Sequence, residues 1–264
     1  MNPVLRHILE TRQIKAPSGE TVPLHSHIPR DEGENLQQII RQIKPRVSVE
    51  IGCAYGISSL YICEALAEVG AEHHIIIDPN QFSGWQGIGI EHLKAAGYAS
   101  LVELQTLPSH QALPRLEAAG IEIDFAFVDG AHWFDYVMVD FFCLDRMLKV
   151  GGVIVFDDAN WPGVRKACRY VLSNRAYSVF PPPANVNGRK GSWARRLLTG
   201  TPVVRKHFDR LAKQEIVQPD WELHLPLPDQ QQYVAVVKEA KDTWISEGEK
   251  GKEGQRTFTF HREF

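Results

Sequence analysis

Short apolar runs alternate with longer amphipathic stretches between about residue 47 and residue 180. Several runs, such as residues 125–128 and 153–156, are wholly apolar, which is typical of strands covered on both faces of a parallel sheet. The predicted strands are 47–51, 74–78, 101–104, 123–129, 152–157, 176–180 and 232–238, and the predicted helices between them are 58–68, 88–96, 109–118, 134–148 and 164–173. This repetition predicts an α/β fold: a Rossmann-like, doubly wound, mostly parallel seven-stranded sheet with helices on both faces.

Three stretches fall outside the alternation and divide the chain into four parts. Residues 1–45 hold an amphipathic helix over 34–43 and are expected to form a helical cover on the core, which comprises 46–180 plus 231–240. Residues 181–230 begin with three prolines and have a basic centre at 189–213. We expect an insertion there, which is either a lid, a contact between copies in a homo-oligomer, or a solvated charged loop. Residues 241–264 form a polar tail.

Composition limits the classes of protein that the chain can represent. The 264 residues are 44% hydrophobic and 23% charged, as in globular proteins, and the formal charge of -3 argues against a nucleic-acid partner. No apolar run reaches the roughly 20 residues that cross a bilayer, and the first residues lack an apolar signal core. The four cysteines form no C-x-x-C pair. We therefore expect a cytoplasmic protein with no membrane partner.

The predicted strand ends carry the candidate chemistry, because ligands of such sheets bind beyond the carboxyl ends of the strands. Gly52 and Gly56 bracket the turn after strand 47–51 with the spacing G-x-x-x-G, whereas a dinucleotide pyrophosphate is typically bound by G-x-G-x-x-G. Glu50, just before this turn, would repel a pyrophosphate and favour a cationic ligand. Asp78 ends the next strand, where an acid either accepts hydrogen bonds from ribose hydroxyls or caps a helix.

Three aspartates follow two further strands that we expect to be neighbours. Asp129 ends strand 123–129, and Asp157 and Asp158 end strand 152–157. Carboxylates that meet at one sheet edge repel one another unless a cation or a proton intervenes, and Mg²⁺ prefers such oxygen ligands. The alternative is that one or two of them cap the following helices. His132 lies at the same edge and could take a proton near neutral pH.

Together these motifs resemble class I S-adenosylmethionine (SAM)-dependent methyltransferases, and most closely the metal-dependent small-molecule O-methyltransferases. That group includes catechol O-methyltransferases and the sugar-modifying enzymes of antibiotic biosynthesis. The stretch 50–58 is similar to the family's first motif, Asp78-Pro79 to its ribose-binding acid, and 109–114 to the stretch over the adenine. The resemblance implies a SAM site built by the following residues: Glu50, Gly52, Ala54, Gly56, Ser58, Asp78, Ser109, His110 and Asp129.

The same resemblance implies Mg²⁺ or another divalent cation at Asp129, Asp157 and Asp158, with His132 and Asp129 as the catalytic residues. The implied activity is methylation of a hydroxyl on a small sugar-like or catechol-like acceptor. Asp158 and His132 are similar to the sugar-modifying enzymes, since the catechol enzymes have asparagine and lysine at these places. Three alternatives stay open: a non-catalytic SAM-binding or scaffold module, an NAD-dependent oxidoreductase on a similar sheet, and a nucleic-acid methyltransferase that uses the basic insertion.

Overall fold

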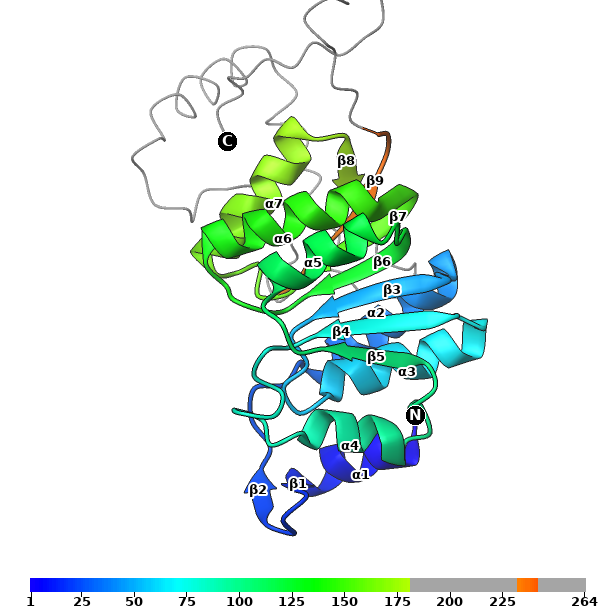
Figure 1. Ribbon diagram of the computed structural model, residues 1–264, viewed down its shortest axis with the longest axis vertical. Coiled ribbons are helices and arrows are strands. Elements are labelled where there is room, and N and C mark those ends of the chain that lie inside the picture. Colours follow the sequence, from blue (N-terminus) through cyan, green and yellow to red (C-terminus); the bar gives the residue numbers. More distant parts are fainter. Residues whose placement is uncertain (181–231, 242–264) are drawn as a thin grey trace, which may run out of the picture.

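The computed structural model describes residues 1–180 and 232–241 (Figure 1). Its centre is a seven-stranded sheet in the order β5–β4–β3–β6–β7–β9–β8. The strands are β3 (Val47–Ile51), β4 (His73–Ile77), β5 (Val102–Gln105), β6 (Ile123–Val128), β7 (Leu148–Phe156), β8 (Tyr177–Val179) and β9 (Val234–Lys238). The first five are parallel to one another, while β9 runs antiparallel to both β7 and β8. The predicted mostly parallel α/β sheet is confirmed.

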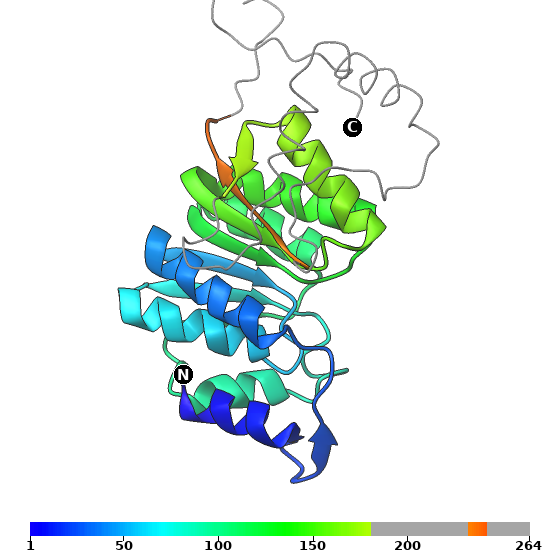
Figure 2. The ribbon, with the colours of Figure 1, turned by 180° about the vertical axis from the view of Figure 1, so that it is seen from behind.

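Helices cover both faces of this sheet (Figures 1 and 2). One face packs against α2 (Arg30–Ile43), α3 (Ile57–Val69) and α4 (Ile88–Ala95), and the other against α5 (Ser109–Ala118), α6 (Phe134–Met147) and α7 (Pro162–Asn174). Successive side chains of β6 enter opposite cores, with Phe125 and Phe127 in one and Ala126 and Val128 in the other. This two-sided burial is the physical reason for the wholly apolar run in the sequence.

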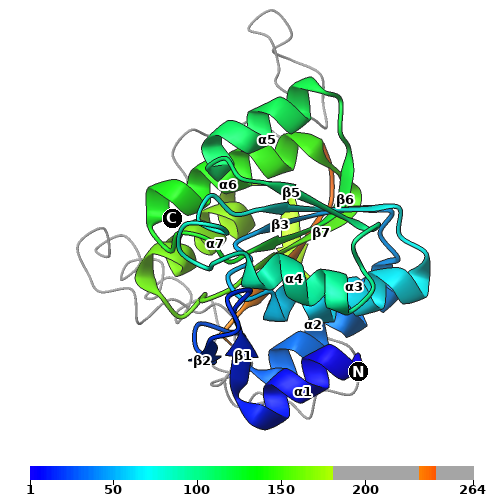
Figure 3. The ribbon, with the colours of Figure 1, turned by 60° about the horizontal axis from the view of Figure 1, so that its bottom comes forward.

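The N-terminal segment is richer than the sequence predicted. Besides α2, which begins at Arg30 rather than at residue 34, it contains α1 (Pro3–Thr11) and the antiparallel pair β1 (Gln13–Lys15) and β2 (Thr21–Pro23) (Figure 3). The side chain of Asn2 caps α1 by accepting a 2.9 Å hydrogen bond from the amide of Val4. α1 buries Leu5 and Ile8 in the same core as α2 and α3. The three-residue strands β1 and β2 carry too few periodic positions to stand out in the sequence.

A further difference concerns the predicted boundary of a strand. β7 begins at Leu148, before the glycine pair at which we expected it to start, and its register with β6 shifts there. Gly151 has a φ of +84°, so the pair makes an irregularity within the strand and not the turn before it. The predicted insertion at 181–230 lies outside the described residues, as does the predicted tail apart from Lys241. Within 1–180 and 232–241 no helix is both long and apolar enough to cross a membrane.

Candidate active site at the carboxyl ends of the strands

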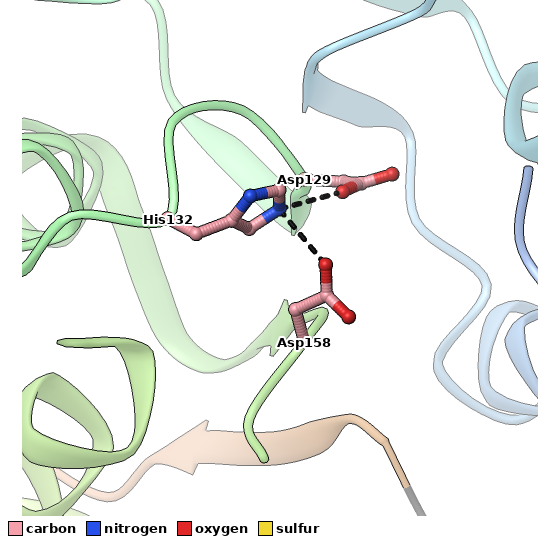
Figure 4. A group of neighbouring side chains, drawn as sticks. All are labelled: Asp129, His132 and Asp158. Atoms are coloured by element: carbon pink, nitrogen blue, oxygen red, sulfur yellow. Dashed lines mark hydrogen bonds and ion pairs between the residues drawn. The ribbon is translucent and has the colours of Figure 1, made fainter. Parts of the chain in front are cut away.

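His132 lies between two of the predicted metal-binding aspartates (Figure 4). β6 and β7 are paired with Val128 opposite Phe156, so Asp129 and Asp157 leave the sheet side by side. Nε2 of His132 lies 3.3 Å from Oδ1 of Asp129 and 3.1 Å from Oδ2 of Asp158. One ligand atom from each of these three half-buried residues lies within 4.8 Å of the others, a spacing that a single ion could bridge. The convergence predicted for this edge of the sheet is therefore present for Asp129, His132 and Asp158.

Asp157 lies at the same corner but makes different contacts. Its Oδ1 accepts a 2.7 Å hydrogen bond from the amide of Asp158, and its carboxyl is also hydrogen-bonded to the side chain of Glu32 from α2. Asp157 is buried, whereas Asp158 is half-buried and has a φ of +50°. This left-handed backbone conformation separates the directions of the two adjacent carboxylates.

Glu32 is a member of this corner that the sequence did not reveal. It lies in the first turn of α2, is 3% exposed, and its Oε1 has no hydrogen-bond partner among the described residues. Burial and the adjacent Asp157 raise the pKa of Glu32 to about 10. An acid in the first turn of a helix is usually a solvated partner of the helix dipole, so its position in the sequence carried no signal of a buried role.

The electrostatics of the corner suit a bound cation. Burial raises the pKa of Asp129 to about 7, against the effect of its hydrogen bond with His132. Burial also raises the pKa of Asp157. The hydrogen bond to Asp129 raises the pKa of His132. Four carboxyl groups thus share one small region with a single imidazole, and a divalent cation with oxygen ligands would relieve their repulsion.

The glycine turn after β3 packs directly against Asp129. Gly52 has a φ of +91°, and a Cβ atom at this position would lie 2.0 Å from the carbonyl oxygen of Asp129. The amide of Asp129 in turn donates to the carbonyl of Ile51 at 2.9 Å. Gly56, with a φ of +78°, stands at the N-terminus of α3, and a Cβ atom there would lie 2.9 Å from the carbonyl oxygen of Gly89. Both glycines are required by close backbone contacts as well as by their conformation.

Asp78 organises this turn through its carboxylate. Its Oδ2 accepts hydrogen bonds from the amides of Cys53 at 3.2 Å and Ala54 at 3.0 Å, and its Oδ1 accepts one from the amide of Asn80 at 2.9 Å. The alternative that Asp78 caps a helix is not observed, because α4 begins only at Ile88 and has Gly87 at its N-cap. Asp78 thus stands where the resemblance places a ribose-binding acid, beside the glycine turn.

Glu50 and Ser58 are brought together beneath the turn. The hydroxyl of Ser58 donates to Oε1 of Glu50 at 2.5 Å, and Oε2 of Glu50 lies 3.0 Å from Nε2 of the buried His74. Nδ1 of His74 lies 2.9 Å from the hydroxyl of Ser48. His74 is a second residue that sequence reasoning missed, because it lies at the start of its strand. The register of β3 against β4 is the signal that could have found it, since it pairs Ser48 with His74.

Ser109 and His110 lie at the start of α5, which follows the carboxyl end of β5. Ser109 is half-buried and hydrogen-bonded to the side chain of Asp140 on α6, whereas His110 is exposed. Asp140 is buried, and its hydrogen bond with Ser109 joins α6 to the first turn of α5. The predicted site residues therefore all lie at or just beyond the carboxyl ends of strands, or next to the turns that follow them.

Comparison with known proteins agrees with this geometry. Residues 49–159 match the family model described as a methyltransferase domain. The tapetum-specific methyltransferase 1 of Arabidopsis thaliana is 32% identical over 140 residues, covering 52% of this chain and 56% of that protein. A caffeoyl-CoA O-methyltransferase of Petunia hybrida is 31% identical over 136 residues, covering 50% and 54%. The chain thus spans a little over half the length of these relatives.

Solved structures show the same fold. An O-methyltransferase from Bacillus cereus, determined with S-adenosylhomocysteine (SAH), superimposes with a TM-score of 0.56 at 17% identity, covering 68% of this chain and 83% of that one. Residues 49–159 are therefore similar to a methyltransferase domain, and the sheet has the fold of this methyltransferase structure. The resemblance to SAM-dependent O-methyltransferases that the motifs predicted is confirmed.

Proposed function

We propose that this chain is a SAM-dependent, divalent-metal-assisted O-methyltransferase that acts on a hydroxyl of a small molecule. The observation that supports this most directly is the position of His132, whose Nε2 lies within 3.3 Å of carboxylate oxygens from both Asp129 and Asp158. A potential proton acceptor and two potential metal ligands thus stand together at the sheet edge, next to a glycine turn that matches the methyltransferase domain model. An oxidoreductase or a passive binding module has no need of this combination.

The turn after β3 and the acids around it would hold SAM. Bound SAM supplies the methyl group as an electrophilic carbon on a sulfonium. The close backbone packing at Gly52 and Gly56 fixes the shape of this turn. Asp78 would accept hydrogen bonds from ribose hydroxyls, and Glu50 would provide a favourable field for the positive sulfonium. Ala54, Ser58, Ser109 and His110 are proposed to complete the SAM site.

The acidic corner would hold a divalent ion through Asp129, Asp157 and Asp158. When bound, such an ion lowers the pKa of a coordinated hydroxyl and fixes its orientation. His132 would accept the proton that the hydroxyl releases, since its Nε2 lies at the same corner, 3.3 Å from Asp129 and 3.1 Å from Asp158. Displacement at the methyl carbon then depends on alignment of the acceptor oxygen with the sulfonium.

A vicinal diol on an aromatic ring is the acceptor class that we favour. Two neighbouring hydroxyl groups would suit a metal with open positions, and a related protein is named for caffeoyl-CoA, which carries a catechol ring. Asp158 and His132, the residues that resemble the sugar-modifying enzymes, keep a sugar-like diol as the second candidate. The cytoplasmic location and the oligomeric contact through 181–230 remain predictions.

Binding and turnover measurements test the proposal. We expect SAH and Mg²⁺ each to raise the melting temperature, whereas NADH leaves it unchanged. With radiolabelled SAM and Mg²⁺ we expect methyl transfer to a catechol, loss of that transfer in excess EDTA, and recovery when Mg²⁺ is restored. EDTA already saturated with Mg²⁺ is the control for effects of the chelator itself. Full turnover in EDTA would contradict metal assistance, and a shift with NADH alone would favour the oxidoreductase.

A further inference from the structure

α2 brings a fourth carboxyl group to the acidic corner. Glu32 is 3% exposed, although the adjacent Asp31 on the same turn is exposed to solvent. The Glu32 side chain is hydrogen-bonded to Asp157, and its Oε1 has no partner among the described residues. This contact joins the first turn of α2 to the residue that follows β7.

The placement of Glu32 is held by tight packing of α2 on α3. A Cβ atom on Gly33 would lie 2.4 Å from the ring of the buried Tyr61, so the two helices approach closely beside Glu32. One turn further on, Nε2 of the Gln37 side chain donates to the carbonyl of Tyr61 at 3.2 Å and to Oε2 of Glu64 at 2.7 Å. The position of α2 is therefore determined independently of Glu32.

A purely structural role explains Glu32 poorly. Burial of a carboxyl group costs free energy that an apolar side chain of the same size would not cost. The contact is made with Asp157, the one aspartate of the three that lies outside the close group of Asp129, His132 and Asp158. Groups that hydrogen-bond to a metal ligand orient that ligand and raise metal affinity.

We propose that Glu32 is a positioning residue that orients the carboxylate of Asp157 for a divalent ion. The proposal rests on the proposed function, since it concerns the ion at that corner. Glu32 acts through its hydrogen bond to Asp157 rather than as a ligand, so a hydrogen-bonding side chain of this length is what the position requires. The N-terminal cover would thereby contribute to the metal site as well as covering the sheet.

Metal affinity in two size-matched variants tests this directly. Glu32→Gln keeps a donor for Asp157, whereas Glu32→Met keeps the volume and removes the donor. We would titrate Mn²⁺ into each full-length chain by calorimetry and measure SAH affinity in parallel. We expect Glu32→Met to weaken Mn²⁺ binding about 10–100-fold, and Glu32→Gln to stay within about threefold of the original chain. Asp31→Gln and Asp31→Met are the matched controls on the same turn, and neither should change the affinity.

Each other outcome has a distinct meaning. Unchanged Mn²⁺ affinity in Glu32→Met would overturn the inference, and an equal loss in both Glu32 variants would overturn it in favour of a charged ligand role. Should Glu32→Met not fold, Glu32→Ala repeats the comparison. A chain that binds SAH but no Mn²⁺ before any substitution would overturn the metal part of the proposed function and this inference together, so the two failures can be told apart.

Discussion

Nε2 of His74 lies 3.0 Å from Oε2 of Glu50, and neither side chain is exposed to solvent. The pair joins β4 to β3, and Ser48 and Ser58 complete its hydrogen bonds on either side. The carboxylate of Glu50, which we propose to provide a favourable field for the positive sulfonium of SAM, is therefore held in place by a buried network of hydrogen bonds. Support for the proposed SAM site reaches from the carboxyl end of β3 to the beginning of β4.

Replacement of His74 by leucine should destabilise the protein strongly. Glu50 would keep its hydrogen bond from Ser58 but lose its second partner while remaining buried, and removal of one member of a buried pair costs about 3–5 kcal/mol. Urea denaturation followed by circular dichroism measures this free energy of unfolding. His73→Leu is the control, because His73 forms a solvent-accessible pair with Glu103 that should contribute no more than about 1 kcal/mol. Equal stability of the two variants would show that the buried network contributes little.

Substitution of alanine for Gly52 should disrupt the site more than its backbone conformation alone explains. The added Cβ would lie 2.0 Å from the carbonyl oxygen of Asp129, so the glycine turn or the acidic corner must move. Gly120 also has a positive φ, of +74°, but a Cβ there meets nothing within 4 Å. Gly120→Ala thus isolates the conformational strain, about 1–2 kcal/mol. We expect Gly52→Ala to lose SAH affinity at least tenfold in calorimetry, while Gly120→Ala keeps it.

Removal of the His132 imidazole should impair turnover rather than SAM binding. If the side chain accepts the proton of the acceptor hydroxyl, His132→Ala should lower kcat about 10²- to 10⁴-fold. The dissociation constant for SAH should stay within about threefold, because the imidazole faces Asp129 and Asp158 and not the glycine turn. His7→Ala, at an exposed position on α1, controls for loss of a histidine as such. A His132→Ala chain with unimpaired kcat would remove His132 from the mechanism.

Asp140 should make the stability of the protein depend on pH. Burial raises the pKa of Asp140 from its ordinary 3.8 to about 6, although Ser109 and His110 act in the opposite direction. The folded protein therefore binds this proton more tightly than the unfolded chain does. The resulting stability is fully present below pH 3.8 and is lost as the pH rises through about 6.

Replacement of Asp140 by asparagine should remove this dependence. We expect Asp140→Asn to be more stable than the original chain by about 1–3 kcal/mol at pH 8 and equally stable near pH 4, because an amide cannot ionise. Chemical denaturation at a series of pH values measures the difference. Asp135→Asn, on the exposed first turn of α6, should show no comparable gain at pH 8. A difference that is constant across pH would contradict the ionisation of Asp140 as its cause.

The strand and helix pattern was predictable because it follows from local burial. Residues 125–128 are apolar because both faces of β6 are covered, and that condition is visible in the run itself. The short N-terminal strands β1 and β2 were missed because they bury too few residues to produce such a run. β1 and β2 are three residues each, and the interior of their pairing is a single buried side chain, Ile14.

What the sequence determined by itself is which residues leave the carboxyl ends of which strands: Gly52 after β3, Asp78 after β4, Asp129 and His132 after β6, and Asp157 and Asp158 after β7. Only the tertiary structure decided which of them touch. It placed His132 between Asp129 and Asp158, turned Asp157 toward Glu32, and set His74 beneath Glu50. Strand ends follow from local patterns of polarity, whereas side-chain contacts depend on the packing of elements that lie far apart along the chain.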